Sequence, residues 1–158
     1  MMTPTEAQTY CTTLTKKSGS NFYYSFLFLP KARRDAMYTV YAFCKEVDNA
    51  VDEPPPGSHP QDELARWRRE LTAAYDGTPT LPVTISLARH VRELSIPPAY
   101  FEELIKGVEM ALTTTRYATF EQLSLYCYRV ASVVGLICLH VFGTTSPRAQ
   151  DYAVNLGM

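Results

Sequence analysis

Two aspartates, Asp48 and Asp52, stand one helical turn apart in the segment YAFCKEVDNAVDE, residues 41–53. If this segment is a helix, the two carboxylates lie on the same face, with their Cβ atoms about 5–6 Å apart. Mg²⁺ prefers oxygen ligands and commonly takes one or two carboxylates together with waters and substrate phosphates. Tyr41 and Lys45 extend the same stripe, and the Lys45 ammonium can attract phosphate oxygens. The spacing therefore indicates a magnesium site that bridges to a diphosphate.

The predicted helix carries two other stripes at helical spacing. The apolar one comprises Val40, Phe43, Val47 and Val51, and a mostly polar one comprises Thr39, Ala42, Glu46, Asn49 and Glu53. We expect the apolar stripe to lie in the core and the polar stripe to face water. The aspartate stripe borders the core, so it should line a cleft. The competing interpretation is a solvated acidic helix end that stops at Pro54, because paired aspartates at this spacing are common.

Apolar residues recur at helical spacing along almost the whole chain, and strand-like alternation is absent. This pattern predicts an all-α fold. The expected helices cover residues 5–16, 31–53, 58–77, 83–94, 97–112, 119–142 and 148–158. Ser58 and Thr119 are expected to cap two of them, each with a glutamine three residues later, and Ser146 precedes Pro147 in another N-cap pattern. The aromatic run FYYSFLFL, residues 22–29, could pass for a strand by itself, and we expect it in the core and in a cavity wall.

The composition is that of an ordinary globular protein, with 158 residues and a net charge of -1. This balance argues against a nucleic-acid partner, which would require a basic face. The four cysteines form no CxxC pair, and the N-terminus shows no signal peptide, so we expect reduced thiols and a cytoplasmic protein. The apolar stretch from Val130 to Phe142 is too short to span a bilayer and is expected to be a buried helix. Peripheral contact with a membrane stays open.

Two long segments resemble the squalene/phytoene synthase family. They are SGSNFYYSFLFLPKARRDAMYTVYAFCKEVDNAVDE, residues 18–53, and RYATFEQLSLYCYRVASVVG, residues 116–135. The likeness extends over essentially the whole chain and is strongest to the bacterial squalene-pathway branch, including presqualene diphosphate synthases. It implies an all-α isoprenoid synthase fold, a helical bundle around a central cavity. It also implies a prenyltransferase that condenses two prenyl diphosphates, most simply farnesyl diphosphate, head to head.

The resemblance also implies a cofactor and a product class. The cofactor is Mg²⁺, or Mn²⁺ in its place, and NADPH is required only if the product is squalene. The product class comprises presqualene diphosphate, squalene, phytoene and dehydrosqualene, which are precursors of hopanoids or carotenoids. The sequence leaves the oligomeric state open.

The resemblance assigns roles to individual residues. Asp48 and Asp52 match the first metal-binding motif, and Tyr41 and Tyr126 match catalytic positions, the latter handling the cation or a departing proton. Ser18, Ser20, Phe22 and Lys45 match positions that bind the substrate diphosphate. These roles have structural alternatives. Tyr126 could be a core tyrosine, and Ser18 and Ser20 could form an ordinary loop break. The chain departs from the family pattern at Asn49, Ala111 and Ser132.

Residues 1–158 are expected to form the N-terminal part of a single domain of this family. A second aspartate-rich motif should follow soon after the segment YAVNLGM, residues 152–158, so the chain by itself is expected to be inactive or nearly so. Two alternatives come from other functional classes. One is a helical assembly or interaction protein of the same fold that has lost catalysis, and the other is a plain helical interaction domain.

Overall fold

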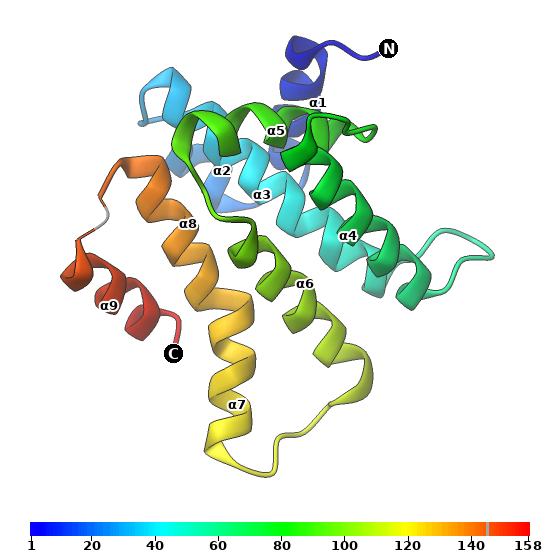
Figure 1. Ribbon diagram of the computed structural model, residues 1–158, viewed down its shortest axis with the longest axis vertical. Coiled ribbons are helices and arrows are strands. Elements are labelled where there is room, and N and C mark those ends of the chain that lie inside the picture. Colours follow the sequence, from blue (N-terminus) through cyan, green and yellow to red (C-terminus); the bar gives the residue numbers. More distant parts are fainter. Residues whose placement is uncertain (145) are drawn as a thin grey trace.

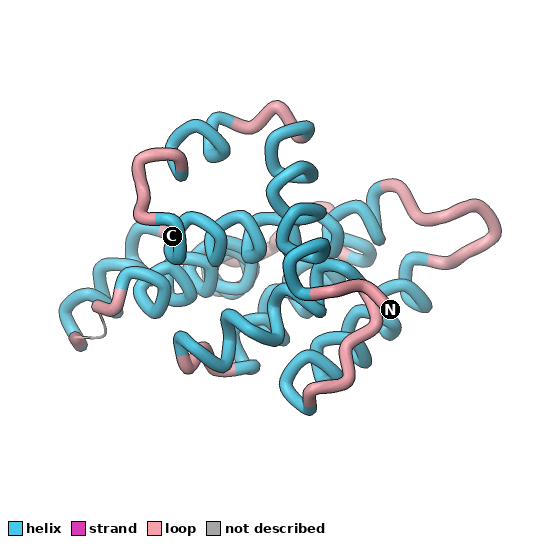
Figure 2. Tube along the Cα trace, turned by 90° about the horizontal axis from the view of Figure 1, so that it is seen from above, coloured by secondary structure: helices cyan, strands magenta, loops and turns pink. Residues whose placement is uncertain are grey.

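The computed structural model describes residues 1–144 and 146–158, and all regular elements in this part are helices. Figure 2 shows these helices joined by loops. They are α1 (Pro4–Lys17), α2 (Asn21–Phe26), α3 (Lys31–Asp52), α4 (Pro60–Asp76), α5 (Pro82–Leu94), α6 (Pro98–Thr113), α7 (Phe120–Cys127), the π-helix η1 (Tyr128–Ser132), α8 (Val133–Phe142) and α9 (Pro147–Leu156). The all-α prediction is confirmed, and the aromatic run after residue 21 forms a short helix rather than a strand.

Helix α3 is the centre of the bundle and contacts α1, α4, α5, α6 and α8 (Figure 1). Its apolar stripe packs as predicted, with Val40, Phe43 and Val47 fully buried. The Phe43 ring meets Trp67 of α4 and Phe101 of α6 edge to face, at centroid distances of 5.6 and 5.1 Å. Aromatic pairs in this geometry add to the stabilisation that burial of their apolar area provides.

The mostly polar stripe of α3 does not face water along its whole length, so that prediction was wrong for its N-terminal half. Thr39 and Ala42 are completely buried, because α1 and α5 cover this side of the helix. The Thr39 hydroxyl lies 2.8 Å from the Ser86 hydroxyl of α5, which satisfies both groups away from water. Only the C-terminal part of the stripe, ending at Glu53, reaches solvent.

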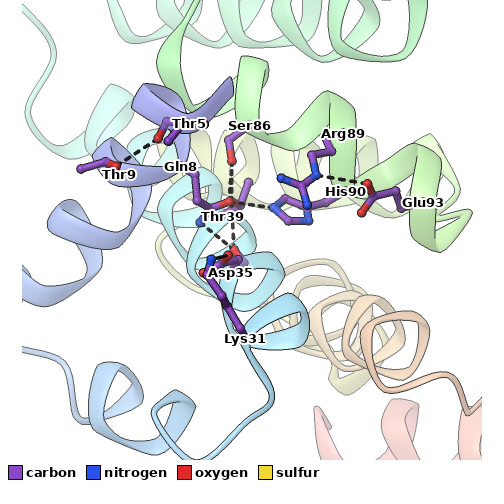
Figure 3. A network of polar contacts seen from close by, with 10 residues as sticks. All are labelled: Thr5, Gln8, Thr9, Lys31, Asp35, Thr39, Ser86, Arg89, His90 and Glu93. Carbon is purple, nitrogen blue, oxygen red and sulfur yellow. Dashed lines mark hydrogen bonds and ion pairs between the residues drawn. The ribbon is translucent and has the colours of Figure 1, made fainter. Parts of the chain in front are cut away.

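A buried polar network joins α1, α3 and α5 through the side chain of Gln8 (Figure 3). Its Oε1 accepts hydrogen bonds from His90 Nε2 at 2.8 Å and from the Ser86 hydroxyl at 3.1 Å, and it lies 3.3 Å from the Thr39 hydroxyl. Its Nε2 donates to the backbone carbonyl of Asp35 at 3.0 Å. Because Oε1 can only accept, Nε2 carries a proton in neutral His90. Burial and the nearby Arg89 lower the pKa of His90, which favours this neutral form.

Among the described residues, side-chain caps form at the starts of four helices, α1, α2, α7 and α9. The Thr119 hydroxyl accepts from the Gln122 amide at 3.2 Å and Ser146 accepts from the Ala149 amide at 3.2 Å, so both predicted caps form. The predicted Ser58 cap was wrong. Helix α4 begins at Pro60 instead, a residue whose fixed φ and missing N–H suit the first helical position. The Ser58 hydroxyl donates to Glu63 at 2.5 Å rather than accepting from a backbone amide.

Helices α7, η1 and α8 form one continuous run from Phe120 to Phe142, where sequence predicted a single α-helix. Gly143 ends it with φ of 76°, a left-handed conformation that glycine adopts without strain. The run is long and apolar enough to cross a membrane by length and composition alone, and it is 28% buried over its most apolar window. The expectation of a buried helix is therefore met only in part. Helix α9 lies along this run (Figure 1).

Candidate active site

The two aspartates of α3 line a cavity of about 320 Å³. The cavity lies between α3, α6 and the long run of α7, η1 and α8. Its other lining residues are Cys44, Val51, Leu104, Val108, Ala111, Tyr126, Val130 and Val134. The walls are therefore apolar apart from the carboxylates, the thiol and one tyrosine. The structure brings Tyr126 into the same cavity as Asp48 and Asp52, although the three residues come from distant parts of the chain.

The cavity and its charges shift the pKa of Asp48. Neighbouring atoms of the cavity wall remove part of the hydration of its carboxylate, which raises its pKa, and the charge of Asp52 raises it further. Lys45 opposes both effects and lowers the pKa, but the net shift is upward. A raised pKa means that the ionised form costs free energy in the absence of a counterion. A divalent cation between the carboxylates would remove this cost.

The residues present fit a magnesium ion of the kind that is shared with a phosphate. No group of three or more His, Cys, Asp or Glu side chains in residues 1–144 and 146–158 could enclose a metal ion. The cavity instead supplies two carboxylates one helical turn apart. Mg²⁺ is commonly held by one or two carboxylates, with waters and substrate phosphates completing its octahedron. Asp48 and Asp52 would be its protein ligands here.

Local backbone geometry places Tyr126 against this cavity. The helix widens into the π-turn of η1 directly after Cys127, and such turns frequently occur at functional sites. On the facing helix α6, a Cβ on Gly107 would lie 2.8 Å from Arg129 Cβ and from Val130 Cγ1. Only a residue without a side chain permits this close approach. Gly107 therefore allows the π-turn to pack against α6.

A second tyrosine accompanies Tyr126. The rings of Tyr117 and Tyr126 stack with centroids 5.4 Å apart and planes inclined by 28°. Burial raises the pKa of Tyr117, and the neighbouring Tyr126 adds to the effect. Sequence reasoning did not single out Tyr117. The available signal was its position inside the family-like segment that begins at Arg116.

The predicted diphosphate-binding residues gather at the turn between α1 and α2. The Tyr41 hydroxyl donates to Ser18 Oγ at 3.1 Å, the Ser20 amide donates to the same oxygen at 3.3 Å, and Ser18 donates to the Thr15 carbonyl at 2.6 Å. The Phe22 ring lies 6.1 Å from the Tyr41 ring. Tyr41 thus holds the turn in place. Ser20 also caps α2, because its hydroxyl accepts from the Phe22 amide at 3.2 Å.

Lys45 connects the two groups of residues. It lines a separate cavity of about 610 Å³ between α1 and α3, together with Ser18 and Lys17. Its charge also acts on Asp48, whose pKa it lowers. The structure therefore does not gather all the predicted residues in one cavity. Asp48, Asp52 and Tyr126 line one cavity, whereas Ser18 and Lys45 line the other, although Lys45 lies on the same stripe of α3 as the two aspartates. Sequence reasoning did not single out Lys17. The available signal was the pair of basic residues at the end of the first helix.

Solved structures share this arrangement of helices. The structure superposes on the squalene synthase HpnC from Alicyclobacillus acidocaldarius with a TM-score of 0.86 and 29% identity, covering 94% of this chain and 56% of the other. A dehydrosqualene synthase matches with a TM-score of 0.82 and 28% identity, covering 98% of this chain and 52% of the other. These matches confirm the predicted isoprenoid synthase fold.

Curated relatives agree in sequence. The chain is 35% identical over 150 residues to a phytoene synthase from Arthrospira platensis, covering 93% of this chain and 48% of the relative. It is 35% identical over 140 residues to a presqualene diphosphate synthase from Rhodopseudomonas palustris, covering 88% and 50%. The chain thus spans about half the length of these relatives. The family profile named Squalene/phytoene synthase matches residues 15–158, and the chain therefore belongs to the squalene/phytoene synthase family.

Proposed function

We propose that the chain is part of a magnesium-dependent prenyltransferase that joins two prenyl diphosphates head to head. The observation that carries this proposal is the shared cavity of Asp48, Asp52 and Tyr126, whose remaining walls are largely apolar. A carboxylate pair at the rim of an apolar cavity suits a substrate with a diphosphate at one end and a hydrocarbon chain at the other. Membership of the squalene/phytoene synthase family supports the same chemistry.

Each residue then has a physical task. Asp48 and Asp52 would hold Mg²⁺, which neutralises the diphosphate and makes it a better leaving group. The ammonium groups of Lys45 and Lys17 attract the phosphate oxygens from the neighbouring cavity. Lysine acts there as a point charge with little directional preference. Together these groups orient the polar end of the substrate toward α3.

The cavity walls protect the reacting carbons. Departure of the diphosphate leaves an allylic cation, which water would quench. Val51, Leu104 and Val108 exclude water from the carbon chain. The Tyr126 ring, backed by Tyr117, can stabilise the cation through its π face, and its hydroxyl can accept or return a proton.

The finer assignment is farnesyl diphosphate as the substrate and presqualene diphosphate as the product. Its support is the likeness to the Rhodopseudomonas palustris presqualene diphosphate synthase. The phytoene synthase from Arthrospira platensis has the same sequence identity to this chain. Phytoene is therefore the alternative product to compare with presqualene diphosphate. Presqualene diphosphate formation consumes no reductant, and NADPH enters only if squalene is made.

The 158-residue chain by itself should not turn over prenyl diphosphate. It supplies one pair of carboxylates and part of the cavity wall, and it spans about half the length of its curated relatives. A diphosphate held from one side only would be poorly neutralised, because charge stabilisation depends on ligands fixed around the leaving group.

The decisive experiment uses the longest polypeptide that contains this chain, incubated with farnesyl diphosphate and Mg²⁺. Extraction and mass spectrometry should detect presqualene diphosphate. We expect Asp48→Asn and Asp52→Asn each to lower kcat by about 100-fold or more, because each removes a metal ligand. Asp76→Asn, at an exposed position at the end of α4, is the matched control and should leave kcat unchanged.

Two outcomes would contradict the proposal. Product formation that persists in both variants would show that the carboxylate pair does not hold the metal. Absence of any condensation product from farnesyl or geranylgeranyl diphosphate would favour the non-catalytic assembly protein. The same assay on the isolated chain tests the expected inactivity, since measurable turnover there would overturn it.

A further inference from the structure

The side chain of Arg129, in the π-helix η1, lies lengthwise against α6. Its Nε donates to Glu103 Oε2 at 2.9 Å, and its Nη1 donates to Met110 Sδ at 3.2 Å. These partners stand four residues before and three residues after Gly107, so the three residues share one stripe of α6. Arg129 Cβ lies 2.8 Å from the point that a Cβ on Gly107 would occupy. Arg129 therefore spans about two turns of α6 and crosses it where Gly107 has no side chain.

The ion pair between Arg129 and Glu103 is partly shielded from solvent. The two side chains are 22% and 25% exposed. Ion pairs at a fully exposed surface are weakened by water and salt, and partial burial reduces this screening. A hydrogen bond from Lys106 above all, together with the one from Arg129, lowers the pKa of Glu103. The carboxylate is therefore ionised at neutral pH, and the contact between η1 and α6 is a charged one.

This contact adjoins two walls of the candidate active site. The neighbouring stripe of α6 forms one wall through Leu104 and Val108, and the run of α7 and η1 forms another through Tyr126 and Val130. Val130 directly follows Arg129 in the chain. Arg129 itself is not among the described residues that line the cavity. It thus joins the two walls without entering the space between them.

We propose that Arg129 is a positioning residue for Tyr126. It stands three residues after Tyr126, in the π-turn that interrupts the helix, and its bonds to Glu103 and Met110 hold this turn on α6. The turn in turn fixes how the Tyr126 ring and hydroxyl are presented to the cavity. This role rests on the proposed function, in which Tyr126 stabilises the cation and handles a proton. Such assistance depends on alignment, because a misplacement of about 1 Å can lower a rate about 100-fold.

Steady-state kinetics of the longest polypeptide that contains this chain test the effect on the reaction. We expect Arg129→Gln to lower kcat with farnesyl diphosphate by about tenfold and to change KM by less than about twofold, because the lost alignment matters in the transition state. Arg129→Lys keeps the charge but not the planar fork, so its kcat should lie between those of Arg129→Gln and the unmodified protein. Arg129→Gln/Glu103→Gln should have the kcat of Arg129→Gln alone, since both changes break the same contact.

Two other ion pairs of α6 supply matched controls. Lys106→Gln removes the second donor to Glu103, at 2.9 Å, and leaves the contacts of η1 intact. Arg68→Gln breaks a pair between α4 and α6, in which Arg68 Nη2 lies 2.6 Å from Glu109 Oε2. It should cost some stability, as the loss of any ion pair between helices can, but neither control should lower kcat. An equal loss of kcat in Arg68→Gln would show that any weakened contact on α6 is sufficient and would overturn the assignment.

A spectroscopic measurement on the 158-residue chain requires no turnover. The chain is labelled with fluorotyrosine, and the fluorine NMR signal of Tyr126 is identified by its loss in Tyr126→Phe. We expect Arg129→Gln to shift or broaden this signal and that of Tyr117, whose ring stacks on Tyr126 with centroids 5.4 Å apart. The signal of Tyr38, which is buried elsewhere in the bundle, should not move. Arg68→Gln should leave all three signals in place.

A Tyr126 signal that is the same in Arg129→Gln and in the unmodified chain would overturn the inference, whatever the kinetics. An unchanged kcat in Arg129→Gln would also overturn it and would leave the proposed reaction standing. If the unmodified polypeptide makes no condensation product, the proposed reaction fails instead. The fluorine signal then still decides whether Arg129 positions Tyr126.

Discussion

At the scale of single residues, the metal-free fold and a bound metal favour different protonation states of Asp48. Its carboxylate lies in a partly desolvated cavity beside Asp52, and both features raise its pKa, although Lys45 lowers it. The ionised form that a metal requires is therefore the form that the metal-free fold disfavours. Functional sites commonly carry such costs, which other parts of the fold offset.

The raised pKa of Asp48 predicts whether removal of its carboxylate raises or lowers the stability of the fold. A raised pKa in the folded state means a penalty that is present above this pKa and absent below the ordinary pKa of aspartate. Asp48→Asn should therefore raise the Tm of the metal-free chain at neutral pH, by about 1–3 °C given the solvent access of the group. Calorimetry across a pH series should show the gain shrinking as the solution is acidified. A gain of the same size at all pH values would contradict this origin.

At the scale of elements, three helices depend on one side chain. Gln8 of α1 joins Thr39 of α3 to Ser86 and His90 of α5, and the last three residues are buried. Buried polar groups that lose their partner pay the cost of desolvation without a hydrogen bond in return. The register of α1 on α3 and α5 is therefore set partly by this amide.

Removal of the amide should loosen α1. We expect Gln8→Ala to lower the free energy of unfolding by about 1–3 kcal/mol, because His90 and Ser86 lose their shared acceptor. Urea denaturation measures the change, which should appear as a lower midpoint with a similar slope. Gln61→Ala, at an exposed position in the first turn of α4, is the matched control and should be close to neutral. Equal urea denaturation midpoints for the two variants would show that the Gln8 amide does not stabilise the packing of α1 on α3 and α5.

The π-turn is a second feature at this scale. It lies between α7 and α8 and packs on α6 where Gly107 leaves room. A glycine also allows the end of α9 to approach the π-turn closely. A Cβ on Gly157, the residue that follows α9, would lie 2.5 Å from the backbone nitrogen of Ser132. The Ser132 hydroxyl donates to the Val154 carbonyl at 2.8 Å, which ties α9 to the π-turn. Small residues therefore position the helix that carries Tyr126.

At the scale of the whole molecule, the long run from Phe120 to Phe142 has an open side. Leu123 and Leu125 are 41% and 44% exposed, and 28% of the most apolar window is buried. An apolar face of this kind on a folded chain tends to recruit a partner surface. For the 158-residue chain in solution, a second copy is the nearest source of such a surface.

We therefore expect the isolated chain to self-associate as its concentration rises. Analytical ultracentrifugation should detect dimers or larger species, and Leu123→Lys/Leu125→Lys should shift the distribution toward the monomer by placing charges on the face. Leu27→Lys, a similarly exposed leucine on α2, serves as the control and should change it less. A chain that stays monomeric at every concentration would contradict this prediction.

Features that depend on residues close together along the chain could be predicted before the structure was known. Helical periodicity placed α3 and put Tyr41, Lys45, Asp48 and Asp52 on one stripe, because 3.6 residues per turn fix which side chains are neighbours. Thr119, Ser146 and Gly143 marked helix ends through bonds or backbone angles that span a few residues. The Ser58 cap failed because Pro60 competed for the same helix start.

Contacts between residues far apart along the chain could not be predicted in this way. The tertiary fold placed Tyr126 in the same cavity as Asp48 and stacked Tyr117 on its ring. It also buried Thr39, which the sequence had assigned to the solvent side. The physical reason is that such contacts depend on how helices cross and how closely their backbones approach. These quantities are set by packing over the whole bundle, as at Gly107, and not by the spacing of residues along one helix.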